Sequence, residues 1–112
     1  MLISGDVVDV DLGVLLGSEA GFPRPVVVVT AQLILDQQPT VIQVVPLTST
    51  IRNFRTEVTI EPQQSGLTQL SAAQCQHLRS ISTARIGQPR GNVGTANLRS
   101  VREILALLMD LE

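Results

Sequence analysis

The order of apolar and polar residues divides most of the chain into short strands. Apolar runs and alternating apolar and polar positions predict strands over residues 5–12, 24–30, 40–47 and 55–61, one long strand or two over residues 70–82, and another short piece around Pro89 and Gly91 within residues 86–93. The four consecutive valines at 26–29 indicate a strand that is buried on both faces. Loops or turns are expected at 13–23, 48–54 and 62–68, and a short connection with one helical turn at 31–39.

The last part of the chain has a different period. Apolar residues recur there at steps of three and four, at Leu98, Val101, Ile104, Leu105, Leu108 and Leu111. This spacing predicts a C-terminal amphipathic helix of roughly four turns, with Thr95 as its N-cap. Short strands closed by one helix favour a mainly β fold, either a small barrel or a strongly bent sheet. Dimerisation is a common way to protect the edges of such a sheet.

Length and composition indicate one folded domain over residues 1–112, with an aliphatic core. The only aromatic residues are Phe22 and Phe54, which excludes a broad stacking platform for nucleic acid. The lone cysteine, Cys75, cannot form an internal disulfide and is expected to be a small buried hydrophobe. With no signal-peptide pattern and no long apolar run, we expect a cytoplasmic protein that makes no membrane contact.

The charges are unevenly distributed along the chain. The net charge is −2, which argues against a generally basic nucleic-acid binder. Residues 20–100 nevertheless carry seven Arg against three acidic residues, so a local basic surface is possible. All basic residues are Arg, whose planar fork binds phosphate through two donors. Asp6, Asp9 and Asp11 alternate along a strand without any His or Cys, so we assign them solvated or capping roles and predict no metal site.

Several short motifs follow one another in a fixed order. They are Gly5-Asp6-x-x-x-Val10-Asp11-Leu12, Gly17-Ser18-Glu19, Arg24-Pro25-x-Val27-Val28, Pro46-Leu47-Thr48-Ser49 and Gln76-His77-Leu78-Arg79-Ser80-Ile81. In this order and spacing they resemble the MazF/PemK toxin family over nearly the whole chain. The resemblance implies an SH3-like small barrel of the CcdB/PemK/MazF type with a C-terminal helix. It also implies a homodimeric, ribosome-independent, sequence-specific endoribonuclease of a type II toxin-antitoxin system, held inactive by a MazE-type antitoxin.

The resemblance also assigns roles to individual residues. It implies that Arg24 and Thr48 are catalytic. The residues expected to bind single-stranded RNA are Ser18, Glu19, Pro25, Ser49, Asn53, Arg55, His77 and Arg79. The chain departs from the family where it has Val7, Val8 and Asp9 in place of the usual aromatic residues, and where His77 replaces a Gln. A different base preference is the expected consequence of the second change.

The residue types fit RNA cleavage without a metal or other cofactor, because the 2′-hydroxyl of RNA is itself the nucleophile. Arg24 supplies fixed positive charge, and the Thr48 hydroxyl can donate to a phosphoryl oxygen. The implied products are a 5′-hydroxyl end and a 2′,3′-cyclic phosphate. Arg is a poor general base, so Glu19 and His77 stay open as candidates for that role.

Other interpretations stay open at this point. Arg24 can pair with Asp11 or Glu19, and Thr48 can make a local turn bond to the backbone. The loop with Arg52, Asn53, Phe54 and Arg55 is either an RNA contact or an ordinary solvated hairpin loop. The rival function is a gyrase-binding toxin of the CcdB type, or a catalytically degenerate antitoxin-binding module. Messenger RNA, tRNA and rRNA are all possible substrates, and the antitoxin is expected to use a disordered, acidic and hydrophobic tail.

Overall fold

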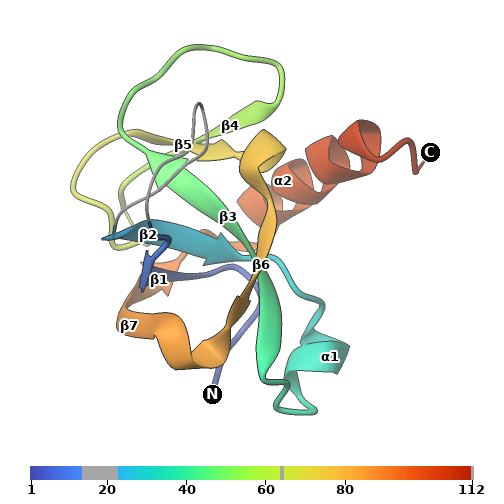
Figure 1. Ribbon diagram of the computed structural model, residues 1–112. Helices are drawn as coiled ribbons and strands as arrows, with labels where there is room; N and C mark the ends of the chain where they lie inside the picture. The colour runs from blue at the N-terminus through green and yellow to red at the C-terminus, as the bar shows by residue number, and fades with distance from the viewer. Residues whose placement is uncertain (14–22, 64, 112) are drawn as a thin grey trace.

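A computed structural model describes residues 1–13, 23–63 and 65–111 of the chain (Figure 1). Two helices and seven strands are present in this part, joined in places by short 3-10 helices. In chain order they are β1 (Asp6–Asp11), β2 (Pro23–Val28), α1 (Gln32–Leu35), β3 (Val41–Thr48), β4 (Glu57–Ile60), β5 (Ser71–Gln74), η1 (Cys75–His77), β6 (Arg79–Ser82), η2 (Thr83–Arg85), β7 (Ile86–Asn92) and α2 (Thr95–Leu108).

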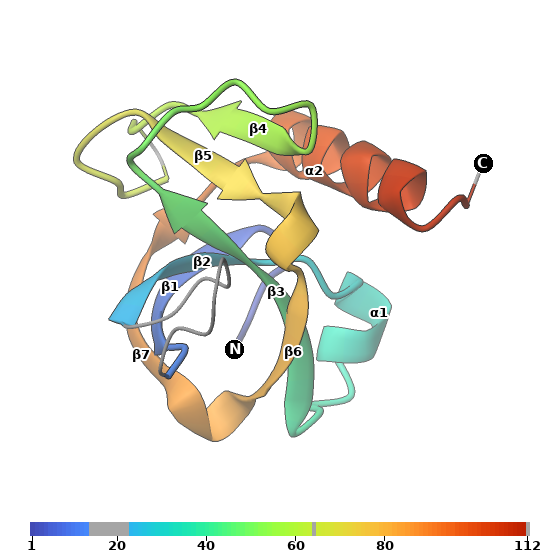
Figure 2. The same ribbon diagram turned by 45° about the horizontal axis from the view of Figure 1, so that its top comes forward.

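The described strands form one antiparallel, strongly bent sheet (Figure 2). The order is β4-β5-β3-β2-β1-β7, and β6 pairs separately with β3. The long strand β3 makes this bend possible, because it changes partner along its length. Its first half, from Val41 to Val44, pairs with β6, whereas Leu47 and Thr48 pair with β5. The predicted mainly β fold with a C-terminal helix is confirmed.

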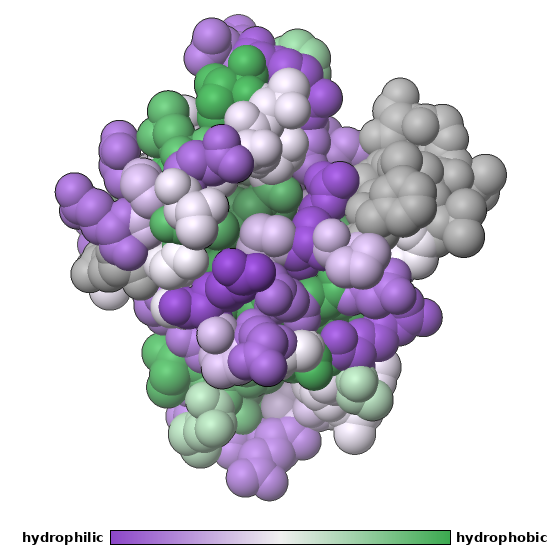
Figure 3. Space-filling model, turned by 90° about the vertical axis from the view of Figure 1, so that its left-hand side faces the viewer, coloured by the Kyte–Doolittle hydropathy of each residue, from purple (hydrophilic) through white to green (hydrophobic). Residues whose placement is uncertain are grey.

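Strand β2 is buried on both faces, as the valine run predicts. Val26 and Val28 point into one hydrophobic cluster, and Val27 points into another; all three are fully buried. The first cluster, here called the barrel core, contains Val8, Val10, Leu12, Val26, Val28, Leu35, Ile42, Val44 and Ile81. The second, here called the helix-side core, contains Val7, Val27, Val29, Val45, Leu47, Ile60, Ala73, Cys75, Val93, Leu98, Val101 and Leu105. A buried valine contributes roughly 1.5–3 kcal/mol, so β2 anchors both cores. On the face of the molecule drawn in Figure 3, hydrophilic residues gather across the middle, whereas the valines of β2 lie buried inside.

The C-terminal helix is present, but its start and its end differ from the sequence expectation. Gly94, with φ +88°, occupies the N-cap position, and Thr95 is the first helical residue. The apolar stripe is buried only over its first half, at Leu98, Val101 and Leu105. Leu108 and Leu111 are 44% and 59% exposed, because the end of α2 extends past the sheet that covers its beginning (Figure 1).

The other boundaries shift by small amounts. Residues 70–82 form two strands, since the 3-10 turn η1 separates β5 from β6. The strand predicted at 24–30 begins one residue earlier, at Pro23, and ends at Val28. The predicted helical turn in 31–39 is α1. Neither described helix has the length and apolar character needed to cross a membrane.

Candidate active site

The pairing of β2 with β3 places the two predicted catalytic residues opposite each other. The register joins Val26 to Pro46, Val27 to Val45 and Val28 to Val44. Two further steps along the same register set Arg24 against Thr48. The hydrogen-bonded ladder ends at the pair of Val26 and Pro46, since Pro25 and Pro46 have no backbone N–H with which to continue it. The two side chains therefore lie where the paired strands open toward solvent.

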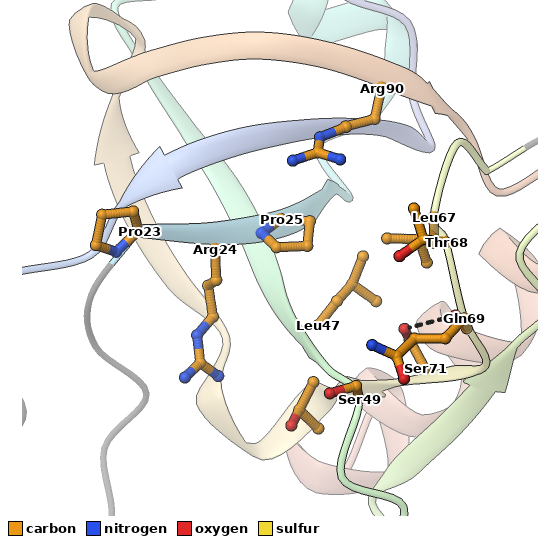
Figure 4. Close-up of a pocket in the computed structure, with 11 residues that line it drawn as sticks. Pro23, Arg24, Pro25, Leu47, Ser49, Leu67, Thr68, Gln69, Ser71 and Arg90 are labelled. Carbon is orange, nitrogen blue, oxygen red and sulfur yellow. Dashed lines mark hydrogen bonds between the residues drawn. The ribbon is translucent and has the colours of Figure 1, made fainter.

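Arg24 and Thr48 line a cavity of about 330 Å³ (Figure 4). Two other predicted residues, Pro25 and Ser49, line it as well. The remaining walls come from the start of β2, the end of β3, the segment before β5, the first residue of β5, and β7. Their residues are Pro23, Leu47, Leu67, Thr68, Gln69, Ser71 and Arg90. The described lining holds two Arg, several hydroxyl and amide groups, and no Asp or Glu. Such a lining suits an anionic ligand.

A neutral side chain orients Arg24. Its Nη1 donates to Oε1 of Gln74 on β5 over 3.2 Å, and Gln74 is only 4% exposed. The described residues contain no ion pair to Arg24. The alternative partner Asp11 accepts a hydrogen bond from the backbone N–H of Gly13 instead, at 2.8 Å. An amide partner fixes the guanidinium without adding a compensating negative charge, so the positive charge remains for a ligand.

Thr48 makes the local turn bond that the sequence allows. Its Oγ1 accepts from the backbone N–H of Thr50 at 3.1 Å. That bond uses a lone pair of the hydroxyl oxygen, and a hydroxyl retains its own hydrogen as a donor. The turn bond holds the hydroxyl oxygen in place and leaves its hydrogen free to be donated to a ligand.

The other predicted RNA-binding residues lie apart from this cavity or outside the description. Ser18 and Glu19 fall outside the described residues. Arg79 donates through Nη1 to the carbonyl of Leu12 at 3.0 Å and so ties β6 to the end of β1. Among the described lining residues of the cavity there is no Asn53, Arg55, His77 or Arg79.

The loop after β3 is held by contacts of its own. Arg52 donates through Nη2 to Oε2 of Glu57 at 3.0 Å, and its guanidinium lies 5.2 Å from the centre of the Phe54 ring. Glu57 also accepts from Nε2 of Gln76 at 2.8 Å. Asn53 has φ +58°, so the backbone turns in the left-handed region at that residue. The loop is thus a built hairpin loop, with Phe54 half-exposed beside it.

Sequence reasoning missed the wall that faces β2 and β3. Thr68, Gln69, Ser71 and Arg90 line the cavity, and no local pattern marks them as site residues. Gly66 shows how this wall is fastened: it has φ +78°, and a Cβ there would overlap the carbonyl oxygen of Arg90. The segment before β5 thus lies directly on the backbone of β7, as only glycine allows. In the sequence, the one sign of this contact is Gly66 itself, which lies in the turn predicted at residues 62–68.

The three aspartates of β1 have separate partners. Asp6 accepts from the backbone N–H of Ile3, and Asp11 accepts from that of Gly13, so the capping role is confirmed for both. Asp9 instead pairs with Arg90 on β7. Cys75 is buried, as predicted, and burial raises the pKa of its thiol to about 11.

The comparisons with known proteins agree with this architecture. The family model for the PemK-like, MazF-like toxin of type II toxin-antitoxin systems matches residues 3–109. Endoribonuclease MazF9 of Mycobacterium tuberculosis is 36% identical over 116 aligned positions, which cover 99% of this chain and 98% of that protein. The chain belongs to the PemK/MazF toxin family.

Solved structures of MazF proteins share the fold of this PemK/MazF chain. MazF from Deinococcus radiodurans superposes with a TM-score of 0.81 at 22% identity, covering 96% of this chain and 94% of that one. An endoribonuclease from a mycobacterial species, solved in complex with its cognate antitoxin, gives 0.79 at 21% identity, covering 100% and 98%. The predicted family and fold are therefore confirmed.

Proposed function

We propose that this protein is the toxin of a type II toxin-antitoxin system and cuts single-stranded RNA as a sequence-specific, metal-independent and ribosome-independent endoribonuclease. One observation supports the proposal most directly: Arg24 and Thr48 line a single cavity whose described walls contain two Arg and no carboxylate. Family membership, and the likeness to a protein named endoribonuclease MazF9, support the same activity. The whole chain would act as one catalytic domain in the cytoplasm, where messages are translated.

In the proposed reaction the 2′-hydroxyl oxygen of one nucleotide attacks the adjacent phosphorus, and the bond from phosphorus to the 5′ oxygen breaks. The 2′ proton leaves to a base, and the departing 5′ oxygen takes up a proton. The products are a 2′,3′-cyclic phosphate and a 5′-hydroxyl. Arg24 stabilises the charge that develops on the phosphoryl oxygens, and Thr48 donates its hydroxyl hydrogen to one of them. DNA lacks the nucleophile and would not be cut.

The remaining predicted residues would contact the RNA around this centre. Pro25 and Ser49 line the cavity next to the proposed catalytic pair and would contact the nucleotides beside the cut. Asn53 and Arg55 are carried by the loop after β3, and His77 by η1, so they would meet more distant nucleotides. Ser18, Glu19 and Arg79 keep the substrate-binding roles that the family resemblance implies.

The test is cleavage of a long single-stranded RNA by the purified protein in EDTA, with the fragment ends mapped. The controls are Arg99→Ala and Thr59→Ala, exposed residues on α2 and β4 that carry the same side chains away from the cavity. We expect discrete cuts with 5′-hydroxyl ends, and losses of about 10²–10³-fold in Arg24→Ala and Thr48→Ala. Intact RNA with folded protein would contradict the proposal, as would Arg24→Ala and Thr48→Ala cutting as fast as their controls.

We further propose that the toxin works as a homodimer and is inhibited by a MazE-type antitoxin. The end of α2 leaves Leu107, Leu108 and Met109 exposed, an apolar surface that a second chain can cover. A disordered tail with acidic and apolar residues matches the positive cavity. The mycobacterial endoribonuclease and the Deinococcus radiodurans MazF were each solved with an antitoxin.

Two measurements test these partners. Light scattering of the purified protein is expected to give twice the chain mass, and a monomer at micromolar concentration would reject the dimer. The antitoxin encoded beside this toxin is expected to suppress RNA cleavage when it is added in equimolar amount. Undiminished cleavage by a saturated complex would show that the bound tail does not cover the cavity.

A further inference from the structure

Arg90 is a second guanidinium in the wall of the cavity, and the proposed reaction gives it no task. It comes from β7, whereas Arg24 comes from β2, and β1 lies between these strands in the sheet. Figure 4 shows Arg90 on one side of Pro25 and the Arg24 side chain reaching away on the other side. The cavity therefore has a cationic group on each of two walls.

Asp9 fixes the orientation of Arg90. Nε of Arg90 lies 3.1 Å from both carboxylate oxygens of Asp9, and Nη2 lies 3.0 Å from Oδ2. These contacts engage one edge of the planar guanidinium. The described residues provide no hydrogen-bond partner for Nη1, so that donor remains for a further acceptor.

The fold does not require this ion pair. The side chains of Arg90 and Asp9 are 41% and 28% exposed, and pairs with such exposure contribute only about 0–1 kcal/mol to stability. The ion pair instead restricts the Arg90 side chain to one orientation. An Arg side chain loses considerable rotamer freedom when it binds a ligand, and one that is already held in place loses less. Asp9 thus presents Arg90 to the cavity in a fixed position.

The size and lining of the cavity suggest what Arg90 meets. At about 330 Å³ the cavity is near the lower limit of small-molecule sites, which suits about one nucleotide. A nucleotide within a strand has a phosphate on each side. Arg24 is assigned to the phosphate that is cut, so the second guanidinium is placed for a neighbouring one.

We propose that Arg90, oriented by Asp9, binds the phosphate next to the one that Arg24 contacts, so that one nucleotide is held between two guanidinium groups. The identity of the strand as RNA rests on the proposed function. The contact itself is to a phosphate, so it is independent of base sequence. Arg90 is a substrate-binding residue in this proposal, and Asp9 is its positioning residue.

The test measures binding without cleavage. The probe is a fluorescent, mixed-sequence, single-stranded oligonucleotide with 2′-O-methyl groups throughout, which removes the nucleophile. Its dissociation constant is measured from about 50 to about 200 mM salt, a range over which phosphate contacts are readily seen. The variants are Arg90→Gln, Arg90→Lys and Asp9→Asn. Arg99→Gln, on α2 away from the cavity, removes the same charge as a matched control.

The two members of the ion pair are expected to differ in their effect on the salt slope. Arg90→Gln should bind more weakly and lose about 0.7 from the salt slope, the value for one phosphate on a single strand. The affinity of wild type should then fall about threefold more than that of Arg90→Gln across the salt range. Arg90→Lys should keep the slope, because the charge is kept. Asp9→Asn should keep the salt slope of wild type, because Arg90 keeps its charge, but should bind more weakly at about 200 mM salt, because Arg90 is no longer held in place.

A purely structural ion pair would behave differently. Arg90→Gln and Asp9→Asn would then lower the melting temperature equally and both keep the salt slope of wild type, and this result overturns the proposal. An Arg90→Gln slope equal to that of wild type and of Arg99→Gln also overturns it.

These outcomes are separable from those of the proposed function. Wild type that cuts RNA while Arg90→Gln keeps the full salt slope refutes the Arg90 contact alone. Wild type that cuts no RNA while Arg90→Gln shows the reduced slope refutes the nuclease and retains the phosphate contact.

Discussion

The two walls of the cavity are built in different ways. The near wall, formed by Arg24 and Thr48 at the ends of β2 and β3, stands on strands that are buried on both faces. The far wall, formed by Thr68 and Gln69 before β5 and by Arg90 on β7, is exposed to solvent. It is held by local turn hydrogen bonds, by the pairing of β7 with β1, by the close approach of Gly66 to β7 and by the ion pair of Arg90. In the proposed reaction, the near wall would supply the rigidity needed to stabilise charge on the phosphoryl oxygens. The far wall would supply the exposed surface needed to contact a long RNA strand.

This comparison predicts that changes in the near wall alter the rate of the chemical step, while changes in the far wall alter substrate binding. Steady-state kinetics separates the two effects as kcat and KM. The three predictions below test the comparison, beginning with the largest expected effect.

Gly66→Ala is expected to displace the far wall. A Cβ would overlap the carbonyl oxygen of Arg90, and φ is +78°, so strain and steric overlap together should lower the free energy of unfolding by about 3 kcal/mol. Gly13→Ala is the matched control: its φ is +83°, but a Cβ there meets no described atom within 4 Å. Denaturant unfolding should show a loss of only about 1 kcal/mol for Gly13→Ala.

The same variant tests whether the far wall affects substrate binding rather than the chemical step. In Gly66→Ala protein that remains folded, KM for RNA is expected to rise by a larger factor than kcat falls, because Arg24 and Thr48 in the near wall keep their positions. Equal losses of stability in Gly66→Ala and Gly13→Ala would show that the contact with β7 does not hold the far wall.

Gln74→Leu is expected to loosen the near wall without removing its charge. Arg24 would lose the acceptor that orients its Nη1, so kcat should fall about tenfold with little change in KM. Gln37→Leu, at an exposed position just after α1, serves as the control. A lower melting temperature with unchanged kcat would assign Gln74 a purely structural role.

Cys75 lies in the helix-side core behind the near wall, and its burial should make the free energy of unfolding depend on pH. Its thiol pKa is raised by burial from 9.0 to about 11. Between these values the unfolded chain releases its thiol proton while the folded chain keeps it, so stability should fall as pH rises from about 9 to about 11. At pH 10 the loss is on the order of 1 kcal/mol.

Unfolding of wild type and Cys75→Ala at pH 8 and pH 10 measures this effect. We expect a smaller pH-dependent loss in the variant, and a native thiol that reacts slowly with alkylating reagents at pH 8. A rapidly alkylated thiol in folded protein would mean that the helix-side core opens readily at this point.

The periodicity of the sequence determined a large part of the fold. The valine run at 26–29 predicts burial on both faces of β2, and the three- and four-residue spacing predicts α2. These predictions hold because apolar periodicity records which faces leave water, and burial is the dominant stabilising term. The positions of Arg24 and Thr48 at strand ends follow from the same patterns, and their proposed roles follow from the family motifs.

Which residues come together in the far wall is determined by the tertiary structure and not by any local sequence pattern. Asp9 and Arg90 are 81 residues apart, and only the placement of β7 beside β1 brings them together. Gly94 rather than Thr95 is the N-cap of α2, because the chain turns into the helix directly after β7. The end of the apolar stripe on α2 is exposed, because the helix extends past the sheet. Local sequence specifies which residues are buried and which strands form. The partners of an exposed charged side chain depend on strand order, which no local pattern encodes.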